Sequence, residues 1–147
     1  MISTSVKIAF QKKADRNTGN EWEYPMYWAI DLHDVIIPGT YTRNNDDREI
    51  SATAIEVLRY LTNKDNMCLI LFTSSYEDSV QDILDWLRKE YKIKFNYVNE
   101  NPEVVSNGLL NVEQKMYFDI LLEDKAGFEI NTDWQEIKNA LIDIGEW

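Results

Sequence analysis

Apolar and polar positions alternate along the chain in blocks that predict strands and helices in turn. Short apolar runs predict buried strands at residues 27–30 and 67–72, and we predict a third strand at residues 93–98 and a fourth at residues 119–122. Apolar residues recur at helical spacing over residues 51–61, 80–91 and 134–144. Short apolar strands between amphipathic helices are typical of a parallel sheet that is covered on both faces. We therefore expect an α/β fold: a three-layer, Rossmann-type sandwich with a mainly parallel central sheet and no large cap domain.

Polar residues at the ends of these stretches predict where two of the helices begin. Ser75 followed by Asp78 resembles a capping box, and Thr132 with Gln135 predicts the cap of the last helix. Gly145 is placed to end that helix.

The first 25 residues lie outside this alternation. Residues 6–10 are apolar and residues 11–24 are polar and turn-rich, which favours an N-terminal strand followed by a long loop. We expect one domain over residues 1–147. Its parts would be an N-terminal extension, a motif-bearing core and a C-terminal helix, over residues 1–25, 26–130 and 131–147.

Composition narrows the class of protein. The 147 residues, 44% of them hydrophobic, are enough for the core of one domain. The net charge of −11 argues against a broad nucleic-acid surface, but it leaves room for a small phosphorylated ligand held by a metal ion. The single cysteine, Cys68, excludes an intramolecular disulfide, and with a single histidine it excludes Cys/His zinc sites. The longest wholly apolar run has six residues, far fewer than the ~20 that span a membrane, so we expect a cytoplasmic protein.

Chemically active residues follow or precede the predicted strands. Asp31 comes after the first strand, Thr73 after the second, and Glu123 and Asp124 after the fourth, which Lys115 precedes. In parallel sheets, sites form where the carboxyl ends of the strands open. Two or more carboxylates there would bind Mg²⁺, while a hydroxyl and an ammonium group would hold the oxygens of a phosphoryl group.

The order of these residues and strands along the chain resembles that of the sequence motifs of the haloacid dehalogenase superfamily of phosphotransferases and phosphohydrolases. YWAIDLHDV (27–35) is similar to the first motif, LILFT (69–73) to the second, and LLED (121–124) to the fourth. Lys115 fits the third motif, and residues 115–128 are particularly similar to small members without a cap. The resemblance covers about residues 27–130.

The resemblance implies a metal-assisted reaction at Asp31. Asp31 would be the nucleophile and would form an aspartyl-phosphate. The carboxylates of Asp31 and Asp124 and the backbone carbonyl of His33 would ligate Mg²⁺. Glu123 would assist directly or through water.

The resemblance also assigns the groups that hold the phosphoryl oxygens. Thr73 would donate a hydrogen bond to one of them. Lys115 would neutralise charge beside Asp31, with Lys125 as the alternative lysine. The substrate would be a phosphorylated compound of unknown identity, and the oligomeric state is left open.

The sequence departs from the family at His33. Phosphatases of the family carry a second Asp at this position, as acid for the leaving group and base for the attacking water. Histidine, with a pKa of about 6.5, is able to do the same work near neutral pH. The departure leaves two functions open: an active enzyme, or a catalytically inactive module that binds metal, phosphate or another protein. A phospho-accepting receiver domain is disfavoured, because receivers carry their acidic pair on the first strand.

Overall fold

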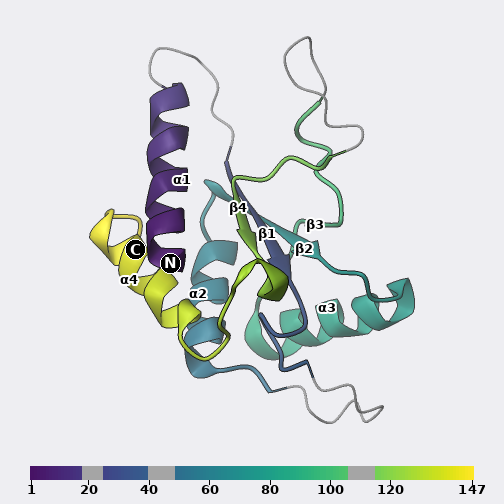
Figure 1. The fold of residues 1–147 in the computed structure, drawn as a ribbon. Helices are drawn as coiled ribbons and strands as arrows, with labels where there is room; N and C mark the ends of the chain where they lie inside the picture. The colour runs from purple at the N-terminus through teal and green to yellow at the C-terminus, as the bar shows by residue number, and fades with distance from the viewer. Residues whose placement is uncertain (18–24, 40–48, 106–114) are drawn as a thin grey trace.

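A four-stranded, all-parallel sheet forms the centre of the fold (Figure 1). The computed structural model describes residues 1–17, 25–39, 49–105 and 115–147. The strands are β1 (Met26–Asp31), β2 (Met67–Phe72), β3 (Tyr97–Val98) and β4 (Ile120–Leu122). The helices are α1 (Ile2–Asn17), α2 (Ala52–Thr62), α3 (Glu77–Tyr91) and α4 (Asp133–Asp143), with a short 3₁₀ helix, η1 (Asp124–Ala126). The predicted α/β class is confirmed.

The order of the strands places β1 inside the sheet. The order is β3-β2-β1-β4, so β1 pairs with β2 on one side and with β4 on the other. In the register, Asp31 lies opposite Phe72, and Ile30 lies opposite Leu122. The chain builds outward from β1 through β2 to β3 and then crosses back to the far side of β1. Such a reversal leaves a crevice at the carboxyl ends of the strands, where α/β proteins bind ligands.

Both faces of the sheet are buried. On one face, Trp28 and Leu69 belong to a large core that also contains Leu58 of α2, Leu87 of α3 and Trp134 of α4. On the other face, a smaller cluster contains the side chains Tyr27, Cys68, Ile70 and Val104, with Tyr97, Met116 and Tyr117 packed against it. Helices flank the parallel sheet, consistent with the predicted three-layer sandwich. On the second face, the cover that the structure describes comes from Val104, Met116 and Tyr117, which lie in the connection between β3 and β4.

The predicted N-terminal strand is wrong, because these residues form α1. The apolar stretch at residues 6–10 favoured a strand, but Ile8 within it is 49% exposed. Val6 is fully buried, and the Phe10 ring packs edge-on against Trp28 at 6.3 Å, so the inward residues follow the spacing of a helix. Of the loop predicted after this strand, residues 18–24 lie outside the described residues.

The predicted capping box at Ser75 is also wrong. Tyr76 occupies the N-cap position of α3, and no side chain there bonds the free backbone N–H groups. Acidic residues in the first turn, Glu77 and Asp78, complement the positive end of the helix dipole. The Ser75 hydroxyl points elsewhere: its Oγ lies 3.4 Å from Nε2 of His33.

The remaining boundaries differ less from the sequence-based expectations. The third strand is shorter than predicted, Tyr97–Val98 in place of residues 93–98. Thr132 is the N-cap residue of α4, as predicted, but its side chain makes no capping hydrogen bond. Gly145 follows the helix with a positive φ of 79°, which suits its predicted role as a stop.

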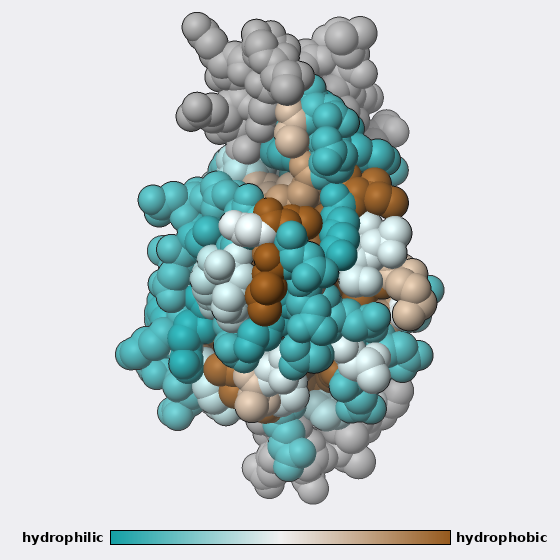
Figure 2. Space-filling model, turned by 90° about the vertical axis from the view of Figure 1, so that its left-hand side faces the viewer, coloured by the Kyte–Doolittle hydropathy of each residue, from teal (hydrophilic) through white to brown (hydrophobic). Residues whose placement is uncertain are grey.

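The two ends of the chain lie side by side, because α1 packs against α4 (Figure 1). An ion pair at 3.0 Å between Lys7 and Asp143 also joins the two helices. The side of the molecule on which they lie is mostly hydrophilic, with small apolar patches (Figure 2). Among the described residues, no helix combines the length and the apolar character that a membrane crossing requires.

Candidate functional site

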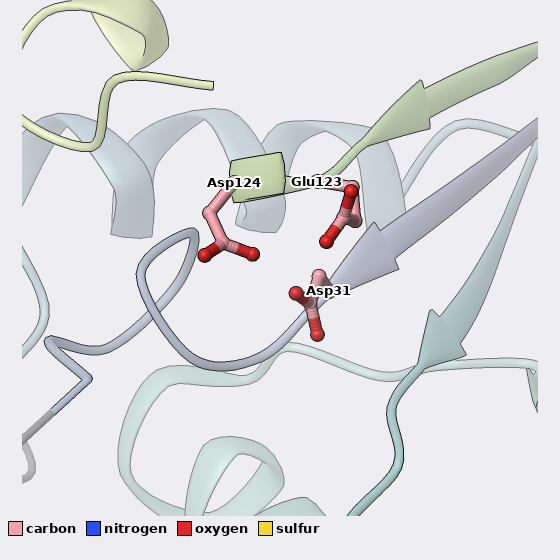
Figure 3. A group of neighbouring side chains, drawn as sticks. All are labelled: Asp31, Glu123 and Asp124. Carbon is pink, nitrogen blue, oxygen red and sulfur yellow. The ribbon is translucent and has the colours of Figure 1, made fainter. Parts of the chain in front are cut away.

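Three carboxylates meet at the carboxyl ends of β1 and β4 (Figure 3). Asp31 is the last residue of β1, Glu123 follows β4, and Asp124 begins η1. Each side chain offers a carboxylate oxygen, and these oxygens all lie within 4.8 Å of one another. The parallel pairing of β1 with β4 brings the three together, because it aligns the ends of the two strands.

A tight turn after β4 fixes the two acidic residues that follow the strand. The carbonyl of Glu123 accepts hydrogen bonds from the N–H groups of Ala126 (3.0 Å) and Phe128 (3.2 Å). Gly127 closes the turn with a φ of 101°, a conformation that glycine adopts without strain. The turn therefore directs Glu123 and Asp124 toward the end of β1.

Burial of its carboxyl group beside two other acidic side chains raises the pKa of Asp31 to about 6, from an ordinary 3.8. Burial is the main cause, and the neighbouring carboxyl groups of Asp124 and Glu123 raise the pKa further. A hydrogen bond of 2.8 Å from the N–H of Leu32 to Asp31 Oδ1 opposes the rise. Three carboxylates in close contact fit a hard divalent cation such as Mg²⁺, which binds oxygen ligands and would offset their mutual repulsion.

The carboxylates line a cavity of about 550 Å³. It collects most of the residues that the sequence indicated; its lining residues are Asp31, His33, Asp34, Gly39, Phe72, Thr73, Ser74, Asn99, Glu123, Asp124 and Lys125. Residues at the carboxyl ends of all four strands thus face one space, and the strand-end pattern predicted those at the ends of β1, β2 and β4.

Lys115 is the predicted site residue that does not line this cavity. It is exposed and precedes β4, whereas the cavity lies where the strands end. Two residues further on, Tyr117 packs edge-on against Tyr27, near the start of β1. A residue that precedes a parallel strand lies toward the opposite edge of the sheet, which is why Lys115 is apart from the residues that line the cavity. Lys125, the alternative lysine, does line the cavity.

His33 lies in a turn that its neighbours hold in place. Asp34 has a φ of 60° and donates its N–H to the carbonyl of Ile37 (2.7 Å). Its carboxylate accepts a hydrogen bond from the N–H of Gly39 (2.7 Å), and a Cβ at Gly39 would clash with this carboxylate. The His33 side chain is exposed at the cavity, with Ser75 as its hydrogen-bonding neighbour.

The loop after β2 supplies hydroxyl groups to the cavity. Thr73 and Ser74 both line it, and Thr73 Oγ1 accepts a hydrogen bond from the N–H of Ser75 (3.2 Å). The proton of the Thr73 hydroxyl remains free to donate to a ligand. Ser74 also lines the cavity and forms no hydrogen bond among the described residues. These donors suit an anion placed beside the acidic cluster.

The sequence interpretation missed Asn99 and Phe72. The Asn99 side chain bonds the backbone of Thr73 on both sides, with Thr73 N–H donating to Oδ1 (2.8 Å) and Nδ2 donating to the Thr73 carbonyl (2.7 Å). Asn99 directly follows a predicted strand, so the strand-end rule that selected Asp31 applies to it as well. Phe72, 39% exposed, gives the cavity an apolar wall beside Asp31.

Comparison with protein-family models, with curated proteins and with solved structures gave no match. The function is therefore argued from the site itself.

Proposed function

We propose that this protein is a Mg²⁺-dependent phosphohydrolase or phosphotransferase of the haloacid dehalogenase type, with Asp31 as its nucleophile. One observation carries the proposal: the carboxylates of Asp31, Glu123 and Asp124 lie within 4.8 Å of one another at the point where the strand order reverses. The hydroxyl-bearing loop that begins at Thr73 lines the same cavity. Cation ligands beside anion donors are what phosphoryl transfer requires, because it depends on positioning and on charge neutralisation.

Each group has a defined part in binding. The three carboxylates, with the backbone carbonyl of His33, would hold Mg²⁺. When bound, the ion supplies positive charge that lets an anionic carboxylate approach an anionic phosphoryl group. Thr73 and Ser74 donate hydrogen bonds to phosphoryl oxygens, and Lys125 adds positive charge at the cavity wall.

The reaction proceeds in two displacements. A carboxylate oxygen of Asp31 attacks phosphorus, the bond to the leaving oxygen breaks, and that oxygen takes a proton from His33. Water then attacks the phosphorus of the aspartyl-phosphate and gives a proton to His33. The bond between phosphorus and Asp31 breaks, which releases phosphate and restores the carboxylate. If an acceptor alcohol takes the place of water, the product is a new phosphoester.

The test is phosphate release from 4-nitrophenyl phosphate and acetyl phosphate, with and without Mg²⁺. We expect Mg²⁺-dependent turnover that the Asp31→Asn variant lacks. The matched control is Asp65→Asn, which changes an exposed carboxylate in the loop before β2 and should leave turnover unchanged. Equal activity in wild type and Asp31→Asn would remove the nucleophile assignment.

A catalytically inactive module that binds metal or phosphate is the second candidate. Two observations favour it: His33 stands where the family carries its acid/base Asp, and Lys115 lies outside the cavity. For such a module, His33→Asp should create phosphatase activity in a protein that has none. Wild-type turnover that is lost in His33→Ala would exclude this second candidate.

A further inference from the structure

Two asparagines bracket β3 and extend its pairing with β2. Before the strand, Asn96 donates its N–H to the carbonyl of Leu69 (2.8 Å), and its Oδ1 accepts the N–H of Leu69 (2.9 Å). After the strand, Asn99 donates its N–H to the carbonyl of Leu71 (2.8 Å). Its side chain then reaches one step further, to Thr73. A strand of only two residues thus gains hydrogen bonds at both ends from side-chain amides.

At Asn99 the side chain takes the place of the backbone. The backbone leaves the sheet there through a left-handed conformation, with a φ of 54°, which asparagine tolerates better than most residues. The side-chain amide uses its oxygen as acceptor and one N–H of its nitrogen as donor, and both bond the backbone of Thr73, at 2.8 Å and 2.7 Å. Asn99 therefore pairs with Thr73 as a further residue of β3 would, beyond the last residue of β2.

The contacts continue from Thr73 across the cavity. Thr73 Oγ1 accepts the N–H of Ser75 at 3.2 Å, and Ser75 Oγ lies 3.4 Å from Nε2 of His33. A continuous series of neighbours thus runs from Asn99 through the loop of residues 73–75 to the loop after β1. Asn99 ties this series to the end of β3.

We infer that Asn99 is a positioning residue that holds the loop of residues 73–75 in the conformation that binds a phosphoryl group. The inference rests on the proposed function, because it gives this loop the phosphoryl oxygens as its ligand. Both polar atoms of the Asn99 side chain are bonded to Thr73, so Asn99 acts through the loop rather than on the substrate. We call the two hydrogen bonds between Asn99 and Thr73 the clamp. Without the clamp, the loop of residues 73–75 would lose its attachment to the end of β3, and its hydrogen-bond donors would no longer be held toward one point.

The experiment compares Asn99→Gly with Asn96→Ala. Glycine accepts the positive φ at residue 99, so this variant removes the clamp without straining the backbone. Asn96→Ala removes a similar exposed clamp from the other end of the same strand, on Leu69. Two quantities are measured: hydrogen exchange at the Thr73 amide by NMR, and the affinity for inorganic phosphate in the presence of Mg²⁺ by calorimetry.

We expect Asn99→Gly to speed exchange at the Thr73 amide and to weaken phosphate binding, each by roughly tenfold. Asn96→Ala should lower the equilibrium constant for folding by roughly tenfold as well. It should leave the phosphate affinity within about twofold of wild type. If Asn99→Gly does not fold, Asn99→Asp serves in its place. It keeps the acceptor for the Thr73 N–H and loses the donor to the Thr73 carbonyl, so its exchange rate should rise less.

Each other outcome is decisive. Phosphate affinity that is unchanged in the Asn99 variant, or that falls equally in the Asn96 variant, would overturn the inference and leave the proposed function standing. Unchanged exchange at Thr73 would show that Asn99 does not hold the loop. If wild type binds no phosphate with Mg²⁺ present, the proposed function fails, and the role of Asn99 in phosphate binding fails with it.

Discussion

A carboxylate oxygen of Asp31 and one of Asp124 lie within 4.8 Å of each other, one at the end of β1 and one in the turn after β4. Nothing in the local sequence of either segment requires this contact, which the parallel pairing of the two strands creates. The proximity is electrostatically unfavourable when both groups are charged. Burial and these neighbours raise the pKa of Asp31 to about 6. The site therefore holds negative charge at the expense of stability.

The first prediction is that Asp31→Asn stabilises the metal-free protein at neutral pH. Asparagine removes the charge and keeps an oxygen that is able to accept the Leu32 N–H. Allowing for solvent screening of this partly exposed group, we expect a gain of about 1–2 kcal/mol in the free energy of unfolding at pH 7.5. Urea denaturation of the metal-free protein measures it, with Asp65→Asn as the control.

The dependence of this gain on pH has a definite sign. Below about pH 4, Asp31 is protonated in both the folded and the unfolded chain and contributes nothing, given a pKa of 3.8 that rises to about 6 on folding. Between these values the folded state binds more protons, so wild-type stability falls as pH rises, and the full loss is present above about pH 6. The gain from Asp31→Asn should therefore grow from pH 4 to pH 7. A gain that shrinks over this range would contradict the burial of charge at Asp31.

A second prediction separates the two candidate lysines. Lys125 lines the cavity, whereas Lys115 is exposed and precedes β4 in the chain. Lys125→Ala should weaken phosphate binding in the presence of Mg²⁺ by roughly three- to tenfold, because it removes a cation beside the anion. Lys115→Ala should leave the affinity as it is. The reverse result would support the lysine that the family resemblance assigned and contradict its position in this structure.

A third prediction concerns the attachment of α1 to the sheet. Lys13 forms an ion pair with Asp119 at 2.9 Å, and both side chains are largely buried, at 13% and 6% exposure. Lys13→Met leaves Asp119 buried without its cation, so we expect a loss of about 2–4 kcal/mol in the free energy of unfolding. Lys7→Met breaks the exposed pair with Asp143 on the same helix and should cost less than about 1 kcal/mol. Equal losses in the two variants would show that the Lys13 pair is not a buried one.

Much of the sheet was predictable from the sequence, because a buried parallel strand has to be apolar on both faces. The run at residues 67–72 gives β2 with its observed bounds, and the run ending before Asp31 gives β1. Polar residues directly after such runs lie at one edge of the sheet. This rule alone placed Asp31, Thr73, Glu123 and Asp124 on one cavity.

What the sequence did not reveal depends on contacts between distant segments. The short apolar stretch at residues 6–10 favoured a strand, and the packing of Phe10 on Trp28, far along the chain, belongs to the helix that these residues form instead. Ser75 has the spacing of a capping residue, yet its hydroxyl lies beside His33 from another loop. The clamp by Asn99 requires β3 to lie beside β2, which no pattern within residues 93–98 specifies.

The central claim is that Asp31, Glu123 and Asp124 together bind a divalent cation, and crystals soaked in Mn²⁺ test it most directly. Mn²⁺ shares the preference of Mg²⁺ for carboxylate oxygens and scatters anomalously. We expect an anomalous peak within bonding distance of Asp31 and Asp124, with Glu123 bound directly or through water, and no such peak in Asp31→Asn crystals. A peak that persists in Asp31→Asn, or wild-type crystals with Mn²⁺ bound only elsewhere, would contradict it.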